Sequence, residues 1–280
     1  MGLGVYLQLP AVQHALIAAT LVAIISGLIG PFVVTRRAAF AVHGVSELSF
    51  TGAVAGLVWA DNAVLGALLG SLVVATGIGL LGVREGERDA AIGVTLAFGL
   101  GVGVFLLSRY HASARAAQNI LFGQIFGVSN AQLVLLLMVA GVVLFAILVL
   151  YRPLLFASVD PEVAAARGVP VKLAGLVFLF VLAVTVTEAA QIVGTLLVLS
   201  LAITPAAAAH RLSSRPAVVA GLSVMFALLA GDGGLLVSLT RLNTTNVPAS
   251  AFITAISFAM YLLARLVGPG LVRRRRHVQG

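Results

Sequence analysis

Long apolar segments follow one another along the whole chain and are separated by short polar stretches. A helix needs about 20 apolar residues to cross the hydrocarbon core of a bilayer. Nine segments are candidates: Val12–Val34, Ala39–Trp59, Asn62–Val83, Ala90–Ser108, Gln132–Tyr151, Leu173–Val186, Ala189–Ala208, Ala217–Leu239 and Ala249–Val267. The pattern predicts an all-α, polytopic transmembrane helical bundle of about nine spans, because a membrane β-barrel would show short segments of alternating hydrophobicity instead.

The boundary between the sixth and seventh segments depends on one charged residue. Leu173–Ala208 is interrupted only by Glu188, and its 36 residues would form a helix of about 54 Å, too long for one crossing. We therefore predict two spans joined by a tight turn near Glu188. One broken or strongly tilted helix is the alternative; it would give eight spans and make Glu188 an intramembrane charge and a second candidate site. Ala116–Val128 is apolar but short, so we expect a re-entrant or interfacial segment.

Composition places the chain outside the soluble globular class. Hydrophobic residues make up 61% of the chain and charged residues 9%, whereas a soluble domain is about 25% charged. The absence of cysteine excludes thiolate metal sites and redox-active dithiols. Lys172 is the only lysine and follows Val171, so the chain has no Walker A loop for ATP, and it has no H-E-x-x-H metalloprotease signature. An intramembrane enzyme is disfavoured because no catalytic constellation is present.

The basic residues divide unequally between the two sides of the predicted bundle. If Arg36 and Arg37 are cytoplasmic, thirteen basic residues lie in cytoplasmic segments and three in outer ones. The thirteen are Arg36, Arg37, Arg84, Arg88, Arg152, Arg167, Lys172, Arg211, Arg215 and Arg273 to Arg276; the three are Arg109, Arg115 and Arg241. The positive-inside rule then predicts the N-terminus outside and the C-terminus in the cytoplasm. The net charge of +8 indicates anchoring to membrane lipid, with no nucleic-acid partner.

Two ionisable residues, His43 and Glu47, lie four residues apart within the second segment. This spacing places both side chains on one helix face, and ionisable groups inside a membrane usually mark a pathway. An imidazole nitrogen and a carboxylate oxygen suit Zn, Mn or Fe(II). The alternative is that the two side chains only bond to each other and satisfy a packing interface. Gly52-Ala-Val-Ala-Gly56, further along the segment, favours close contact with another helix.

The longest polar stretch, residues 152–172, contains the signals of a short capped helix. Asp160 can cap its start, with Pro161 at the first position and Glu162 in the first turn. Gly168 can end it. A two-turn helix at the cytoplasmic face would suit docking on a partner. An ordinary interfacial loop is the alternative.

Three stretches resemble the membrane subunits of the ABC-type manganese/zinc/iron transporters. They are Pro31–Arg37 running into Phe40–Gly56, the loop Ser158–Val169 with its Asp-Pro-Glu and Gly-Val elements, and Val193–Ala209, a helix ending in proline and small residues; Leu121-Phe-Gly123 also fits. The resemblance extends from about Gly27 to Pro248. The second and third stretches are fairly specific in combination, whereas each alone would be weak.

This resemblance implies a permease subunit of an ATP-driven importer of divalent transition-metal ions, with residues 1–280 as one transmembrane domain. Such a subunit is not an enzyme and binds no permanent cofactor, since two separate ABC ATPase subunits would hydrolyse ATP and dock at the Asp160, Glu162 and Gly168 region. A second permease copy, an extracytoplasmic metal-binding protein and the plasma membrane of a prokaryote are implied as well. An ion-gradient-driven transporter without an ATPase is the alternative.

The chain departs from the family pattern at two positions. The family usually has Asp and then His, four apart, in the second helix, whereas the matching residues here are His43 and Glu47. The donor atoms are of the same kind in reversed order, so a metal site with His43 and Glu47 as ligands is still implied, and the choice among Zn, Mn and Fe stays open. Asn243–Pro248 replaces an expected Asp-x-Pro-like segment, and no role is transferred there.

Overall fold

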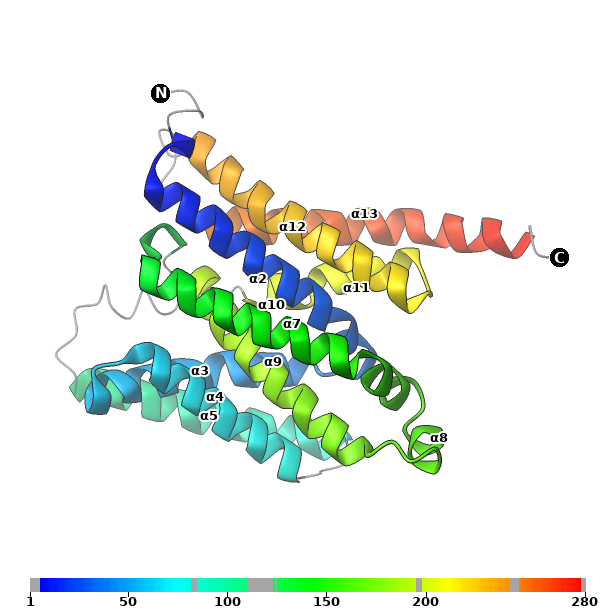
Figure 1. Cartoon of the computed structure of the whole chain (residues 1–280), viewed down its shortest axis with the longest axis horizontal. Coiled ribbons are helices and arrows are strands. Elements are labelled where there is room, and N and C mark those ends of the chain that lie inside the picture. The colour runs from blue at the N-terminus through cyan, green and yellow to red at the C-terminus, as the bar shows by residue number, and fades with distance from the viewer. Residues whose placement is uncertain are drawn as a thin grey trace. The chain divides into compact units, whose positions relative to one another are not determined.

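The computed structural model describes residues 6–81, 85–109, 123, 125–194, 198–241 and 247–277, and every regular element in this part of the chain is a helix (Figure 1). The elements are α2 (Pro10–Thr35), α3 (Ala39–Ala60), α4 (Ala63–Leu81), α5 (Glu85–Arg109), η1 (Ile125–Gly127), α7 (Asn130–Val159), α8 (Pro161–Ala166), α9 (Val171–Val193), α10 (Val198–Ala202), α11 (Thr204–Leu212), α12 (Pro216–Arg241) and α13 (Ala249–His277). Eight of these helices are long and apolar enough to cross a membrane. The predicted all-α polytopic bundle is confirmed.

The predicted turn at Glu188 is wrong. Helix α9 runs without interruption through Glu188 and ends at Gly194, whose φ of +102° favours glycine. A crossing needs about 20 residues, and Glu188 is only the eighteenth residue of α9, so the helix has not completed a crossing where the turn was predicted. The predicted span Ala189–Ala208 is therefore divided between the end of α9 and the short helices α10 and α11, which leaves eight candidate spans and one shorter apolar segment.

The chain forms two compact units. Unit 1 comprises Met1–Val34, Ile125–Leu137 and Leu199–Gly280, and unit 2 comprises Thr35–Gln124 and Met138–Val198. In unit 1, α2 and α12 pack in opposite directions, because Gly27 lies against Val224 and Gly231 lies against Ala23. The absence of a side chain at Gly27 permits this contact, since a Cβ atom there would approach the Val224 Cα to 2.6 Å.

The first and last spans of unit 1 run in the same direction. Helices α12 and α13 form an antiparallel hairpin, with Gly234 packed on Ile253 near the start of α13. Because α2 is antiparallel to α12, α2 is parallel to α13. Arg211, at the end of α11, contacts Gly268 in the C-terminal part of α13, so these residues share one end of the unit. The start of α2 and the end of α13 therefore lie at opposite ends of unit 1. The placement of the termini across the membrane stays a prediction.

In unit 2, α3 and α4 approach closely through glycines. A Cβ atom on Gly52 would collide with the Gly66 carbonyl oxygen, and one on Gly56 would lie 2.7 Å from the Gly66 Cα. Gly70 packs against Gly52 in the same way. Small residues at such spacing let helix backbones meet in a membrane. The close helix contact predicted from Gly52 and Gly56 is confirmed.

Other predictions differ from the structure in their bounds or lie outside its described part. Helix α7 extends to Val159, eight residues beyond the predicted span Gln132–Tyr151, so the first part of the 152–172 segment is helical. Most of Ala116–Val128 and of Asn243–Pro248 lies outside the described residues.

Candidate metal site and coupling segment

Helix α3, which carries His43 and Glu47, is the least hydrophobic of the eight candidate spans and also the most buried. In its most apolar window 67% of the residues are buried, against 17–22% in α4, α5, α7 and α13. Polar residues in a membrane helix are costly on a lipid-facing surface. The sequestering of α3 therefore matches its polar content.

His43 and Glu47 share one face of α3, which is turned away from α4. At 3.6 residues per turn, this face lies roughly 140 to 180° around the helix from Gly52 and Gly56. Glu47 is 5% exposed and His43 is half-buried. The ring of Phe40 lies 6.3 Å from that of His43, at a tilt of 49°. The carboxylate is therefore enclosed by protein.

One ring nitrogen of His43 has no hydrogen-bond partner in the described part of the chain. His43 Nδ1 is buried and has no hydrogen-bond partner there, and the structure records no hydrogen bond between His43 and Glu47 in that part. Ser49 donates from Oγ to the Ser46 carbonyl oxygen at 2.6 Å, and it lies on a different face of α3. Among the described residues, no three His, Cys, Asp or Glu side chains converge, so a metal held here would take its other ligands from amides, hydroxyls, backbone or water.

The predicted capped helix at the end of α7 is present as α8. The Val163 N–H donates to Asp160 Oδ1 at 3.0 Å, and Pro161 occupies the start of the helix. Gly168 follows the last turn with a φ of +82°, a conformation that favours glycine. The predicted boundaries from Asp160 to Gly168 are confirmed.

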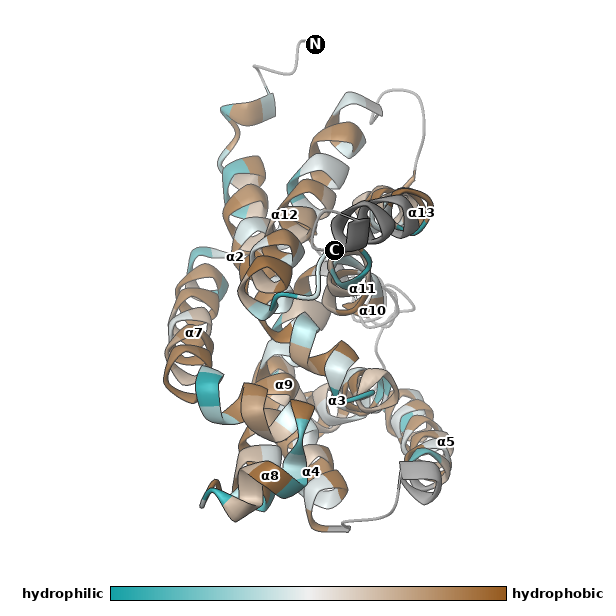
Figure 2. Cartoon of the chain, turned by 90° about the vertical axis from the view of Figure 1, so that its right-hand side faces the viewer, coloured by the Kyte–Doolittle hydropathy of each residue, from teal (hydrophilic) through white to brown (hydrophobic). Residues whose placement is uncertain are grey.

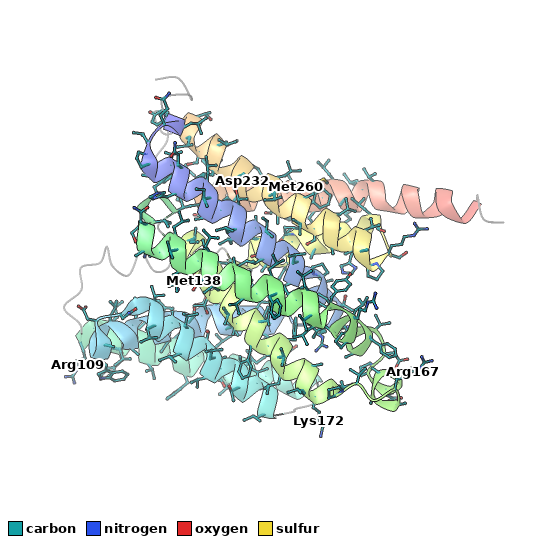
Figure 3. All side chains as sticks on the ribbon, viewed as in Figure 1. Arg109, Met138, Arg167, Lys172, Asp232 and Met260 are labelled. Atoms are coloured by element: carbon teal, nitrogen blue, oxygen red, sulfur yellow. The ribbon has the colours of Figure 1, made fainter. Side chains whose placement is uncertain are left out.

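Helix α8 presents most of its surface to the outside of unit 2. Ala164 is its one fully buried residue, while Val163 is 44% exposed and the adjacent Val159 is 69% exposed. Figure 2 shows hydrophilic and hydrophobic residues side by side on this helix. Arg167 and Lys172 flank the turn between α8 and α9 (Figure 3). A short, firmly capped helix with exposed apolar and charged side chains is suited to docking on another protein.

Arg36 connects three parts of unit 2, a role that sequence reasoning missed. Its Nε donates to Ser158 Oγ on the last turn of α7 at 2.6 Å. Its guanidinium carbon lies 4.9 Å from the centre of the Phe178 ring on α9, a cation–π geometry. Arg36 itself stands in the turn just before α3. The two helices that flank α8 are thereby tied to the start of the helix that carries His43 and Glu47.

Two acidic residues outside the predicted pair lie within spans. Asp232, which Figure 3 labels, lies within α12. Both of its carboxylate oxygens accept from Thr20 Oγ1, at 3.1 and 3.2 Å, so it makes a polar contact within unit 1. Glu188 is 4% exposed within α9. In the sequence, Glu188 was recognisable as a candidate site because it is the single charged residue in a 36-residue apolar run.

The chain has clear relatives. The family model described as ABC 3 transport family matches residues 8–268. The manganese transport system membrane protein MntC of Halalkalibacterium halodurans is 30% identical over 258 residues, covering 92% of this chain and 87% of that protein. The high-affinity zinc uptake system membrane protein ZnuB of Haemophilus influenzae is 25% identical, covering 90% and 96%. The structure of PsaBC from Streptococcus pneumoniae in complex with Fab aligns with 98% of this chain and 96% of that one, with 26% identity and a TM-score of 0.84.

Proposed function

The chain belongs to the ABC 3 transport family, and on that premise we propose that it is the membrane permease of an ATP-driven importer of a divalent transition-metal ion. The relatives named for manganese and zinc transport support this substrate class. The observation that carries the proposal is the enclosed face of α3. Glu47 offers an oxygen donor there, and His43 Nδ1, which has no hydrogen-bond partner among the described residues, offers a nitrogen donor. Both Mn and Zn accept such donors.

The ion is cargo, so its site must release it. Two protein ligands completed by water hold an ion less firmly than a closed tetrahedral cage. The ion would arrive from an extracytoplasmic metal-binding protein, contact His43 and Glu47, and leave toward the cytoplasm. This is alternating access between two states, so the affinity for the ion has to differ between them.

The energy for that change would come from two separate ATPase subunits that dock on α8 and its flanks, at Asp160, Glu162 and Gly168. A second permease copy would complete the assembly in the plasma membrane of a prokaryote. Arg36 provides a route for the motion, because it joins α7 and α9 on either side of α8 to the start of α3.

Transport by the complete complex in proteoliposomes tests this proposal. Uptake of Mn²⁺ or Zn²⁺ is expected to require ATP and the ATPase subunits and to persist when a protonophore removes the proton gradient. Uptake that follows an imposed ion gradient and ignores ATP would favour the secondary-transporter alternative.

Replacing Arg36 with alanine is expected to separate ATP hydrolysis from transport. The substitution removes a charged hydrogen bond worth about 1.5–3 kcal/mol, so metal uptake per ATP hydrolysed should fall about ten-fold while the ATPase rate stays within about two-fold. Arg152→Ala, which removes an exposed arginine of α7, is the control and should keep the wild-type ratio. An unchanged ratio in Arg36→Ala would remove this residue from the coupling route.

A further inference from the structure

The last two turns of α9 carry polar side chains that the proposed metal site does not use. Glu188 lies within the candidate span Val171–Ile192 and is 4% exposed. Its Oε1 atom is buried and has no hydrogen-bond partner in the described part of the chain. A carboxylate in this setting is expensive and calls for a functional explanation.

Two neighbours of Glu188 on α9 also have buried polar atoms without a hydrogen-bond partner among the described residues. Thr187 is fully buried, and Thr187 Oγ1 and Gln191 Nε2 likewise lack hydrogen-bond partners among the described residues. Gln191 is three residues from Glu188 and four from Thr187, so its side chain lies next to each of them on the helix surface. Each unsatisfied buried polar group destabilises the folded protein. Packing alone would be served better by apolar residues, such as the buried Val186 and Ala190 beside them.

The charge of this region favours a cation. A helix C-terminus carries a partial negative charge of about half an electron that acts within the last turn, and Gln191 lies in the last turn of α9, which ends at Gly194. The carboxylate of Glu188 and the amide oxygen of Gln191 are oxygen donors of the kind that Mn²⁺ accepts. Broken membrane helices provide ion ligands from such ends in transporters.

Glu188 lies at a depth close to that of Glu47. Helices α3 and α9 pack against each other and start side by side, because Arg36 contacts Phe178, so they run in the same direction. At 1.5 Å per residue, Glu47 is about 12 Å beyond the start of α3 at Ala39, and Glu188 is about 15 Å beyond Phe178 on α9. Since no three acidic or histidine side chains converge among the described residues, Glu188 is not a third ligand of the His43–Glu47 pair.

We propose that Glu188, together with Gln191, forms a second divalent-cation station in unit 2, built from oxygen donors and distinct from the nitrogen–oxygen pair on α3. This inference rests on the proposed function, because it assumes that a metal ion passes through the unit. Two stations at similar depth would let an ion exchange one set of ligands for another without full rehydration, and binding at each can stay weak enough for release.

The test counts Mn²⁺ bound to the detergent-solubilised permease–ATPase complex by electron paramagnetic resonance, with Mn²⁺ alone as the probe. Wild type should bind two ions per permease. Glu188→Gln removes the charge and keeps the shape, and it should lose one ion or bind it more than about ten-fold more weakly. Thr185→Val is the control, because Thr185 is buried on the same helix and its hydroxyl is already bonded to the Val181 carbonyl oxygen; it should bind as wild type.

The double variant His43→Ala/Glu47→Ala separates this inference from the proposed function. It should keep the ion at Glu188 and lose the other. If it binds as wild type while Glu188→Gln loses an ion, the α9 station stands and the α3 site fails. If Glu188→Gln binds Mn²⁺ as wild type does, the α9 station is overturned. Failure of Glu188→Gln to assemble would also overturn it, because the charge would then serve folding.

Discussion

Replacing Glu47 with alanine is expected to reduce metal uptake by about 100-fold or more while the complex with its ATPases still assembles. The substitution leaves His43 as the only predicted protein ligand, and one imidazole cannot compensate a divalent ion for the hydration shell that it loses in the site. Loss of even a residue that supports a metal ligand commonly reduces metal affinity or activity 10–100-fold. Removal of a carboxylate that is costly to bury in a membrane helix should not weaken the fold. Uptake of radioactive Mn²⁺ or Zn²⁺ by cells that produce equal amounts of each variant measures the effect.

Ser49→Ala is the matched control for Glu47→Ala. Ser49 is also buried on α3 and is 2% exposed, but its hydroxyl bonds to the Ser46 carbonyl oxygen within the helix. The variant should transport the metal at a rate close to that of wild type. Normal uptake by Glu47→Ala, or an equal loss in both variants, would contradict a specific role for the carboxylate.

The glycine contact between α3 and α4 is expected to be the most sensitive packing contact of unit 2. In Gly66→Val, the new Cβ atom would collide with the Gly52 carbonyl oxygen and lie 2.6 Å from the Gly56 Cα. Both neighbours are backbone atoms, so neither can rotate away, and α4 must separate from α3. Overpacking costs about 1–3 kcal/mol or more, which should reduce the yield of assembled complex about ten-fold. Size-exclusion chromatography of a fluorescently tagged complex measures the yield.

Gly77→Val tests whether that loss is specific. Gly77 lies on the same helix, and a Cβ atom there would meet nothing within 4 Å. The two variants add the same side chain to α4, so a difference in helix propensity cannot separate them. We expect wild-type yield from Gly77→Val. Equal yields from Gly66→Val and Gly77→Val would mean that the close approach of α3 and α4 is not required.

Local features that depend on neighbouring residues could be predicted from the sequence. The bounds of α8 follow from Asp160, Pro161 and Gly168, because each acts on the backbone within a few residues. The shared face of His43 and Glu47 follows from helix geometry alone. The contact surface of α3 with α4 could be predicted from Gly52 and Gly56, because two glycines four residues apart lie on one helix face.

Features that depend on distant parts of the chain could not be predicted in this way. The contacts of Arg36 with Ser158 and Phe178 join residues more than 100 positions apart. The glycines of α4 that meet α3 were overlooked, although Gly66-Ala-Leu-Leu-Gly70 has the same spacing as its partner. The predicted end of α9 was wrong because the length of an apolar run does not show where the helix stops. The helix stops at Gly194 and not at the charged residue Glu188.

The two sides of α3 have different functions. The side with Gly52 and Gly56 holds α4 at close range, and the opposite side carries His43 and Glu47. A firmly packed helix can keep two ligands in a fixed relation, which a metal site requires. Arg36 at the start of α3 then links this site to the helices that flank α8.

A structure of the complete transporter with Mn²⁺, recorded with anomalous scattering at the manganese edge, would show which side chains hold the ion. We expect an anomalous peak within coordination distance of an imidazole nitrogen of His43 and a carboxylate oxygen of Glu47. The peak should disappear in Glu47→Ala and persist in Ser49→Ala. The absence of any manganese peak at His43 and Glu47 in the wild-type transporter, or a peak there that survives Glu47→Ala, would show that these residues do not hold the ion.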